Sequence, residues 1–487
     1  MLLSHSTHDL DAPSSRFTLP QAPQTQLEHY LDRFERFFVV LAIVYQTSCL
    51  YALLSWNFNS LDPMMTRTDA PTEANSPLGG LMRYFVLLCF GILLTVRWRS
   101  VWEAAKRRKA LWLLLGWLLI SCRWSMNPNS QKLANDVILN SIMGLYMASR
   151  FTLREIMPMA ALGFGITVGM NFLFCLAFPQ FGIQVGLQEG SWRGMLVQKN
   201  SLARLVVFAA IPFLCFVFSG IKQHRLWYWI GLVTCSIIVI LSNSKTGLLI
   251  FLMMKVLIPI FQKMRSRSYY ALPMFIAVLL LASMTTLLLV GNYEAILTGL
   301  GRDPSLSGRT EIWEAMGEKI MQRPLTGYGY AGFWMAREGE SIDIWYRSKD
   351  LPPHGHNGYL NLSLDLGLVG LAFFWMSYWK AFQRSFLWLR WTSGPEGLMP
   401  LLTMCEIFVY NITEESLIAD ANFNVFWMFY VYLTTVILLH PVEYPLQASP
   451  IQSSEGLEER IDDTNHNWES DIDFQPTPAL GSGVERP

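Results

Sequence analysis

Long apolar stretches separated by short polar connections dominate the pattern of this chain from about residue 35 to about residue 440. A helix that crosses a bilayer needs about 20 mostly apolar residues. Stretches of about this length are predicted at residues 37–56, 81–97, 109–124, 133–149, 154–178, 202–219, 226–242, 246–262, 270–291, 358–379, 397–412 and 420–440. The third and fourth are the weakest, and one of them can instead be a tilted or interfacial helix. The pattern predicts an all-α, polytopic membrane helical bundle of about 12 transmembrane helices.

One polar segment, residues 292–358, interrupts this pattern between the ninth and tenth stretches. Basic residues in short connections mark the cytoplasmic side of a membrane protein. If the N-terminus is cytoplasmic, the inner connections hold the basic residues of segments 97–108, 150–154, 222–225, 263–267 and 380–390. The same count places residues 292–358 outside, as one large external loop between spans 9 and 10.

Polar ends flank the membrane part of the chain. Residues 1–34 and the acidic residues 441–487 are predicted to be disordered and cytoplasmic, leaving residues 35–440 as the membrane domain. Charged residues make up 15% of the chain, against about 25% in soluble domains, which again indicates a membrane protein. The formal net charge of +0 gives no sign of a nucleic-acid partner. The seven cysteines lie in or beside apolar stretches, so a disulfide framework is not expected.

Four groups of polar residues fall on the side predicted to be external: residues 192–200, residues 242–247, the long loop, and residues 411–415. They bring Arg193, Lys199, Lys245 and Arg309 to a side where basic residues are usually sparse. Attraction for an anionic ligand explains this gathering, and snorkelling at the interface is the alternative for any one residue.

Inside the loop, Ser305 or Ser307 can cap a helix whose apolar face is formed by Ile312, Ala315, Met316 and Ile320. Arg309 then lies in the first turn, where free N–H groups and the helix dipole favour anions. A surface arginine is the alternative. Further along, Gly327, Gly329 and Gly332 alternate with Tyr328 and Tyr330, which indicates either aromatic rings displayed for sugars or a turn packed into the core.

His354 and His356 follow Pro352-Pro353 and directly precede an apolar stretch. A histidine in this place can act as a general base, because its ordinary pKa is near 6.5. A hydrogen-bonded interfacial histidine is the plain alternative. Only Asp350 is nearby as a third ligand, so a metal site is not expected. Glu406 lies within an apolar stretch, where an ionisable group usually pairs inside the bundle.

Several short motifs occur in an order that resembles the O-antigen ligase and Wzy-type polysaccharide polymerase superfamily over about residues 35–440. These motifs are Trp192-Arg193-Gly194, Lys199-Asn200-Ser201-Leu202-Ala203, Ser244-Lys245-Thr246, Ser307-Gly308-Arg309 with Trp313, Pro324-Leu325-Thr326-Gly327-Tyr328-Gly329, His356-Asn357-Gly358-Tyr359-Leu360 and Gly367-Leu368-Val369-Gly370. The lysine at Lys245, where many ligases have arginine, is closer to the ExoQ-like exopolysaccharide branch.

The resemblance implies a metal-independent, inverting glycosyltransferase of the bacterial inner membrane, with no cofactor and with its active site on the external, periplasmic face. The donor would be a glycan on an undecaprenyl-diphosphate-type lipid, and the acceptor a saccharide or lipid-core hydroxyl. By motif position, His356 would be the base, and Arg193 and Arg309 would hold the diphosphate. Substrate contacts would come from Lys199, Asn200, Lys245, Asn357 and one of Glu414 and Glu415.

Membrane lipids and the machinery for polysaccharide export and chain length are the further partners that this reading predicts. The main alternative is a transporter of a lipid-linked sugar or small anion, since a bundle of about 12 spans also suits that class. Transporters usually place such groups near the membrane midplane on broken helices. In this sequence they gather at outer helix ends, which favours an enzyme. A third interpretation, a structural subunit of an export complex, is supported by no feature of the sequence.

Overall fold

The computed structural model describes residues 26–55, 77–184, 189–196, 198–265, 273–277, 279–281, 284, 309–335, 339–347, 354–415, 417–418 and 424–439. Within these ranges the regular secondary structure is helical, apart from one isolated antiparallel bridge between Ile183 and Trp192. The predicted all-α class is therefore confirmed.

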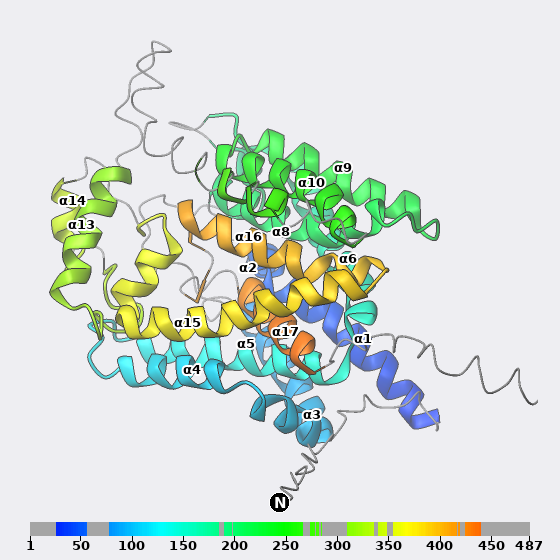
Figure 1. Ribbon diagram of the computed structural model, residues 1–487, viewed down its shortest axis with the longest axis horizontal. Helices are drawn as coiled ribbons and strands as arrows, with labels where there is room; N and C mark the ends of the chain where they lie inside the picture. The colour runs from blue at the N-terminus through cyan, green and yellow to red at the C-terminus, as the bar shows by residue number, and fades with distance from the viewer. Residues whose placement is uncertain are drawn as a thin grey trace, which may run out of the picture. The chain divides into compact units, whose positions relative to one another are not determined.

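Most of the helices overlap the predicted apolar stretches, although the stretch at 37–56 is divided between two helices; Figure 1 shows their arrangement. Their bounds are α1 Gln26–Gln46, α2 Cys49–Ser55, α3 Pro77–Lys106, α4 Lys109–Ser121, α5 Ser130–Arg150, α6 Leu153–Ala177, α7 Pro179–Gly182, α8 Lys199–Phe218, α9 Arg225–Leu241, α10 Lys245–Arg265, α13 Arg309–Gln322, α14 Ile342–Arg347, α15 Gly358–Trp391, α16 Met399–Thr413 and α17 Asn424–Leu439, with the short 3-10 turn Pro395–Gly397 before α16. The predicted stretch at 270–291 lies mostly outside the described residues. Helix α1 begins at Gln26, so the prediction of disorder up to residue 34 is wrong for residues 26–34.

Among the residues that the structure describes, five helices are long and apolar enough to cross a membrane: α3, α6, α8, α10 and α15. Three shorter apolar helices, α4, α9 and α17, accompany them in the described part of the chain. With 13 residues and a rise of about 1.5 Å per residue, α4 is only about 20 Å long, which agrees with its weak span signal. The count of about 12 spans and the external position of the long loop remain predictions.

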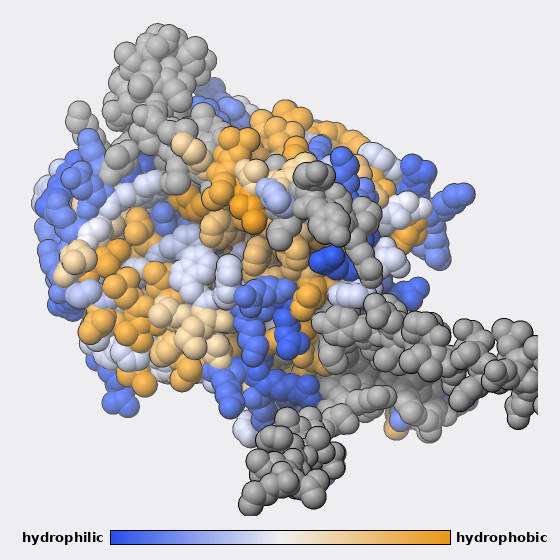
Figure 2. Space-filling view, viewed as in Figure 1, coloured by the Kyte–Doolittle hydropathy of each residue, from blue (hydrophilic) through white to orange (hydrophobic). Residues whose placement is uncertain are grey.

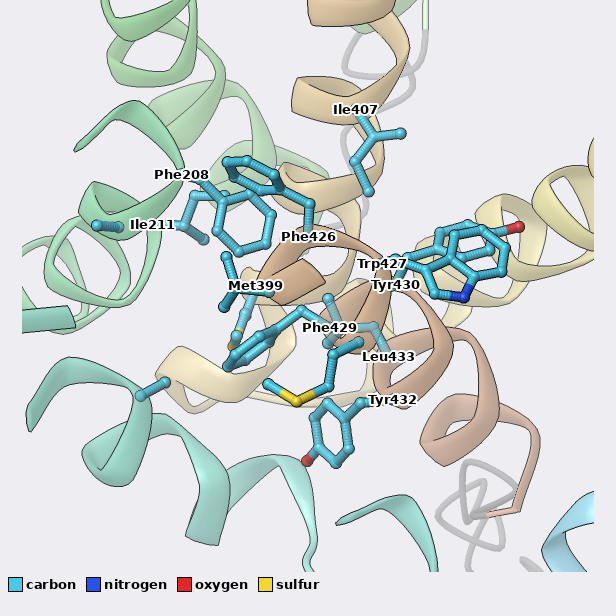
Figure 3. Packing of buried hydrophobic residues seen from close by; sticks show 14 of the residues in the cluster. Phe208, Ile211, Met399, Ile407, Phe426, Trp427, Phe429, Tyr430, Tyr432 and Leu433 are labelled. Atoms are coloured by element: carbon cyan, nitrogen blue, oxygen red, sulfur yellow. The ribbon is translucent and has the colours of Figure 1, made fainter. Parts of the chain in front are cut away.

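Helix α17 lies in the centre of the packed core and is buried on nearly every side. In Figure 3, Phe426 and Phe429 of α17 lie on the side of Phe208 and Met399, whereas Trp427 and Tyr430 point to the other side of the helix. The ring of Phe208 on α8 meets Phe426 edge to face at 4.8 Å and Phe429 at 5.9 Å between centroids. A helix that is apolar all round is expected at such a position, surrounded by other helices.

A network of buried charges joins α1, α3 and α5 at the end of the bundle predicted to be cytoplasmic. The carboxylate of Glu35 is fully buried and accepts from Arg97 at 2.9 Å, Arg150 at 2.6 Å and the Tyr146 hydroxyl at 3.1 Å. Removing one partner from such a group strands a buried charge, which is strongly destabilising. The basic residues counted as loop charges from the sequence therefore also fix the helix packing.

Helix α15 is broken at Gly367, whose φ of 68° and ψ of −178° suit glycine alone. The turn at residues 324–329 fills the break through three backbone hydrogen bonds: Leu368 N to Pro324 O at 2.7 Å, Tyr328 N to Leu364 O at 2.7 Å, and Gly329 N to Asp365 O at 3.0 Å. A Cβ atom at Gly367 would collide with the Leu325 carbonyl. The turn at residues 324–329 and the break at Gly367, which are separate in the sequence, thus pack together through backbone hydrogen bonds.

The interpretation of Tyr328 and Tyr330 as displayed rings is wrong, because both side chains are buried. Their hydroxyls donate to the carbonyls of Lys319 and Ile418, so the rings belong to the core of the turn. Helix α13 packs against α15 and also carries α14 beside it (Figure 1). The predicted apolar face of α13 is buried as expected. Figure 2 shows hydrophilic residues over α13 and α14 and hydrophobic ones over the neighbouring face.

Candidate functional site

His356 lies in the short segment that leads into α15, with a backbone φ of 49°. Positive φ is uncommon for a residue with a side chain, and it tends to persist where the surrounding structure enforces it for function. The next residue, Asn357, caps α15: its Oδ1 accepts from the backbone N–H groups of Tyr359 and Leu360, each at 3.0 Å. Its Nδ2 donates to the Ile412 carbonyl at 3.0 Å. The Asn357 amide is thus occupied within the protein, which favours a capping role over the predicted substrate contact.

The imidazole of His356 is oriented by Glu414, with 3.1 Å between Nδ1 and Oε2. An ionised carboxylate can only accept, so Nδ1 carries the proton in this contact. In the neutral ring, Nε2 then keeps its lone pair and can take a proton from a substrate. This is the arrangement that a general base requires.

Glu414 also holds the other predicted site residues together. Its Oε1 accepts from Arg309 NH2 at 3.0 Å and from Asn200 Nδ2 at 3.3 Å. The carboxylate is buried, which by itself would raise its pKa, but the charges of Arg309 and His356 and the hydrogen bond from His356 hold the pKa well below its usual range. Glu414 is therefore ionised at neutral pH, with a cation on one oxygen and the imidazole on the other.

Arg309 is the first residue of α13, as predicted from the sequence, whereas the candidate caps Ser305 and Ser307 lie outside the described residues. Its NH1 donates to the Thr413 carbonyl at 3.0 Å, which ties α13 to the C-terminal end of α16. Trp313, one turn later, donates from Nε1 to the Gly355 carbonyl at 2.8 Å. Helix α13 thus carries Arg309 to the histidine segment.

A second acid and histidine pair lies beside the first. Glu415 Oε2 accepts from Asn361 Nδ2 at 2.6 Å and lies 4.0 Å from His354 Nδ1. The ring centroids of His354 and His356 are 4.3 Å apart, and the His356 backbone N–H donates to His354 Nδ1 at 3.3 Å. His354 therefore braces the segment that carries His356.

The sequence motifs did not point to two further contributors, Asn361 and Arg204. Asn361 lies one helical turn after Asn357 on α15, and its Oδ1 also accepts from Trp334 Nε1 at 3.0 Å. Arg204 lies within the apolar helix α8 and donates to the Glu415 carbonyl. An ionisable residue in an apolar stretch is a general signal of a buried polar site. That signal was applied to Glu406 and applies equally to Arg204.

Lys199 and Lys245 are the first residues of α8 and α10. Lys199 Nζ lies 3.4 Å from the Asn243 carbonyl, and the charge of Lys245 acts on it. A cation in the first turn opposes the helix dipole, so two neighbouring helices that both begin with lysine concentrate positive potential. The next residue on α8, Asn200, reaches Glu414, so this basic pair adjoins the His356 group.

Arg193 is held separately, in the segment that precedes α8. Its Nε donates to the Phe181 carbonyl at 2.8 Å, and burial lowers its pKa. Among the described residues, its hydrogen bonds do not join it to Arg309, His356 or Glu414. The structure thus brings together His356, Arg309, Asn200 and Glu414 directly, and leaves Arg193 outside that group.

No group of three or more His, Cys, Asp or Glu side chains in the described residues is arranged to hold a metal ion. Asp350, the third ligand considered from the sequence, lies outside those residues. Whether the chemistry needs a metal therefore remains a prediction for experiment.

Sequence comparisons identify relatives of the chain. Residues 230–375 match the sequence profile of the O-antigen ligase family. The predicted resemblance is confirmed. A Rickettsia conorii protein named "Putative polysaccharide ligase" is 24% identical over 286 residues, which cover 56% of this chain and 66% of that relative. The Exopolysaccharide production protein ExoQ of Rhizobium meliloti is 32% identical over 95 residues, 19% of this chain and 22% of that relative.

The residues that match the family contain only part of the candidate site. They include Lys245, Arg309 and His356, carried by α10, α13 and the segment before α15. Asn200 on α8 and Glu414 after α16 lie outside them and complete the group from the two sides. The site is therefore assembled from helix ends that are far apart in the sequence.

Proposed function

We propose that this protein is a membrane glycosyltransferase that moves a glycan from a lipid-linked diphosphate donor to a hydroxyl of a saccharide or lipid-core acceptor. The donor is of the undecaprenyl-diphosphate type, and the transfer inverts the anomeric centre without a metal ion. The site works on the external face of a bacterial inner membrane. The observation that best supports this function is the group formed by His356, Glu414 and Arg309.

His356 serves as the base in this proposal. Its Nε2 takes the proton of the acceptor hydroxyl as the oxygen attacks the anomeric carbon, and the bond from that carbon to the diphosphate breaks. Glu414 holds the ring in the required tautomer and stabilises the imidazolium that forms. Attack from the face opposite the leaving group inverts the centre.

The basic residues hold and stabilise the leaving diphosphate. Arg309 offers a planar fork of donors that matches phosphate oxygens. Lys199 and Lys245 add positive charge at two adjacent helix starts, where an anion is favoured. Arg193 lies apart from this group and acts on a more distant part of the anionic donor. Since the leaving group is already activated, positioning and charge stabilisation supply most of the rate.

A transporter is the alternative, and the broken helix α15 is a feature of that class. In transporters the free backbone groups of such a break bind substrate. Here the turn at residues 324–329 occupies the Gly367 break through backbone hydrogen bonds. The charged candidates lie instead at helix ends around His356, which supports an enzyme.

The decisive experiment measures glycan transfer from purified lipid-linked donor by the His356→Ala variant. We expect transfer to fall by about 10²–10⁴-fold, the usual value of a general base, while donor binding persists. His354→Ala is the matched control and should retain substantial activity, because His354 only braces the segment. Wild-type transfer by His356→Ala would refute the mechanism. Loss of wild-type activity on adding a chelator would contradict its independence of metal.

A further inference from the structure

Tyr410 has an uncommon property among the buried tyrosines. It lies in α16, one turn before Glu414, and its side chain is fully buried. Its hydroxyl has no hydrogen-bond partner among the described residues. By contrast, the buried hydroxyls of Tyr378 and Tyr432 donate to the carbonyls of Met404 and Phe151. A buried hydroxyl without a partner lowers stability, so its presence beside a site indicates a use in another state of the protein.

The side chain of Tyr410 packs in the hydrophobic core, and the charges that act on its hydroxyl are those of Glu414, Arg204, Glu406 and Arg309. Glu414 follows the last residue of α16 with an extended backbone, and its N–H donates to the Tyr410 carbonyl at 3.0 Å, so the two residues lie one turn apart at this helix end.

A second observation points to the same helix end. The hydroxyl of Thr413 is also buried and without a partner among the described residues, while its carbonyl accepts from Arg309. Arg309 is thus the cation shared by the Thr413 carbonyl and the Glu414 carboxylate. If Arg309 leaves, both lose a donor, and the unpartnered Tyr410 hydroxyl is one turn away.

We propose, on the basis of the function above, that Tyr410 is a positioning residue for glycosyl transfer. When Arg309 turns from Glu414 to the phosphate groups of the donor, the Tyr410 hydroxyl donates to the Glu414 carboxylate in its place. Glu414 then stays aligned on His356 while Arg309 serves the leaving group. In this exchange, the hydrogen bond from Arg309 to Glu414 is lost when the donor binds, and the hydrogen bond from the Tyr410 hydroxyl to Glu414 replaces it.

The test is the Tyr410→Phe variant, which keeps the ring and removes only the hydroxyl. The exchange operates after the donor has bound, so kcat should fall about tenfold, the order expected for one hydrogen bond to a charged group, with an unchanged KM for the donor. The melting temperature should stay equal or rise, because an unsatisfied group has been removed. Tyr378→Phe is the matched control, and it should melt lower with an unchanged kcat, since its hydroxyl has a partner.

Three results would overturn this assignment: a wild-type kcat in Tyr410→Phe, a raised KM with an unchanged kcat, or a lower melting temperature like that of Tyr378→Phe. The first would show that the hydroxyl is unused. The second would make it a direct donor contact, and the third a structural one. His356→Ala in the same series separates the two proposals. If His356→Ala is inactive and Tyr410→Phe is normal, only the role of Tyr410 fails, whereas an active His356→Ala removes the proposed function itself.

Discussion

The Glu414→Gln substitution tests the core of the site, because glutamine has the same shape but only one accepting oxygen. In the structure Oε1 of Glu414 faces Arg309 at 3.0 Å, and Oε2 faces His356 Nδ1 at 3.1 Å. Both partners donate to the carboxylate. A glutamine can satisfy only one of them, and its NH₂ group must face the other.

Either orientation of the amide damages the site. If the NH₂ group faces His356, Nδ1 has to accept, which places the ring proton on Nε2 and removes the base. If it faces Arg309, two donors oppose each other and the guanidinium is displaced. A wrong tautomer lowers turnover by up to about 10⁴-fold in the triad enzymes, and a general base is worth about 10²–10⁴-fold. We therefore expect kcat to fall by about 10²–10⁴-fold.

The assay follows transfer from purified lipid-linked donor under single-turnover conditions, beside Glu415→Gln as the matched control. Glu415 bonds Asn361 and lies farther from its histidine, so its variant should lose no more than about tenfold, the order of one hydrogen bond. Full activity in Glu414→Gln, or a larger loss in Glu415→Gln, would show that transfer does not depend on the Glu414 carboxylate beside His356.

The same residue predicts a pH dependence of stability. The folded-state pKa of Glu414 is lowered by Arg309 and His356 despite its burial, so this carboxylate stabilises the fold above its unfolded pKa of about 4.3. That contribution is lost as the pH falls below about 4.3 toward the folded value. In melting curves taken between neutral pH and about pH 3, wild type should therefore lose stability more steeply than Glu414→Gln. Parallel curves would contradict the prediction.

Three further outcomes are expected. Arg309→Lys should transfer poorly although the charge is kept, because lysine lacks the planar fork that engages two phosphate oxygens; wild-type kcat would remove that role. Gly367→Ala should destabilise the protein by about 1–3 kcal/mol or more, since its φ of 68° and the Leu325 carbonyl leave no room for a Cβ atom, and an unchanged melting temperature would contradict this packing. In a cysteine-free background, Tyr346→Cys should react with an impermeant thiol reagent from outside and Glu103→Cys should not, and the reverse pattern would invert the topology.

The long helices α3, α6, α8, α10 and α15 could be predicted from the sequence because each contains an apolar stretch long enough to cross a bilayer. The breaks could not. Gly367 interrupts α15 within an apolar run, and the break exists only because the turn at residues 324–329 supplies its hydrogen bonds. The start of α1 was also missed: polar residues such as Asp32 were taken for a tail, although Asp32 forms ion pairs with Arg36 and Arg150.

Some residues of the candidate site could be singled out from the sequence, but their arrangement could not. Arg309 and His356 stand out because cations and histidines are rare beside apolar stretches on the predicted outer side. Spacing along the chain could not show that Glu414, rather than Glu415, reaches His356, because adjacent residues point in different directions at a helix end. It also could not show that the Asn357 amide is used for capping.

One carboxylate, Glu414, links the two proposed tasks of the site, since it contacts both the base and the phosphate-binding arginine. While Arg309 pairs with Glu414, one carboxylate is shared between the arginine and the imidazole of His356. If the donor diphosphate draws Arg309 away, we expect Glu414 to keep its contact with Nδ1 of His356, so that the base stays aligned while the arginine serves the leaving group. Two separate carboxylates, one for each task, would not link donor binding to the base in this way.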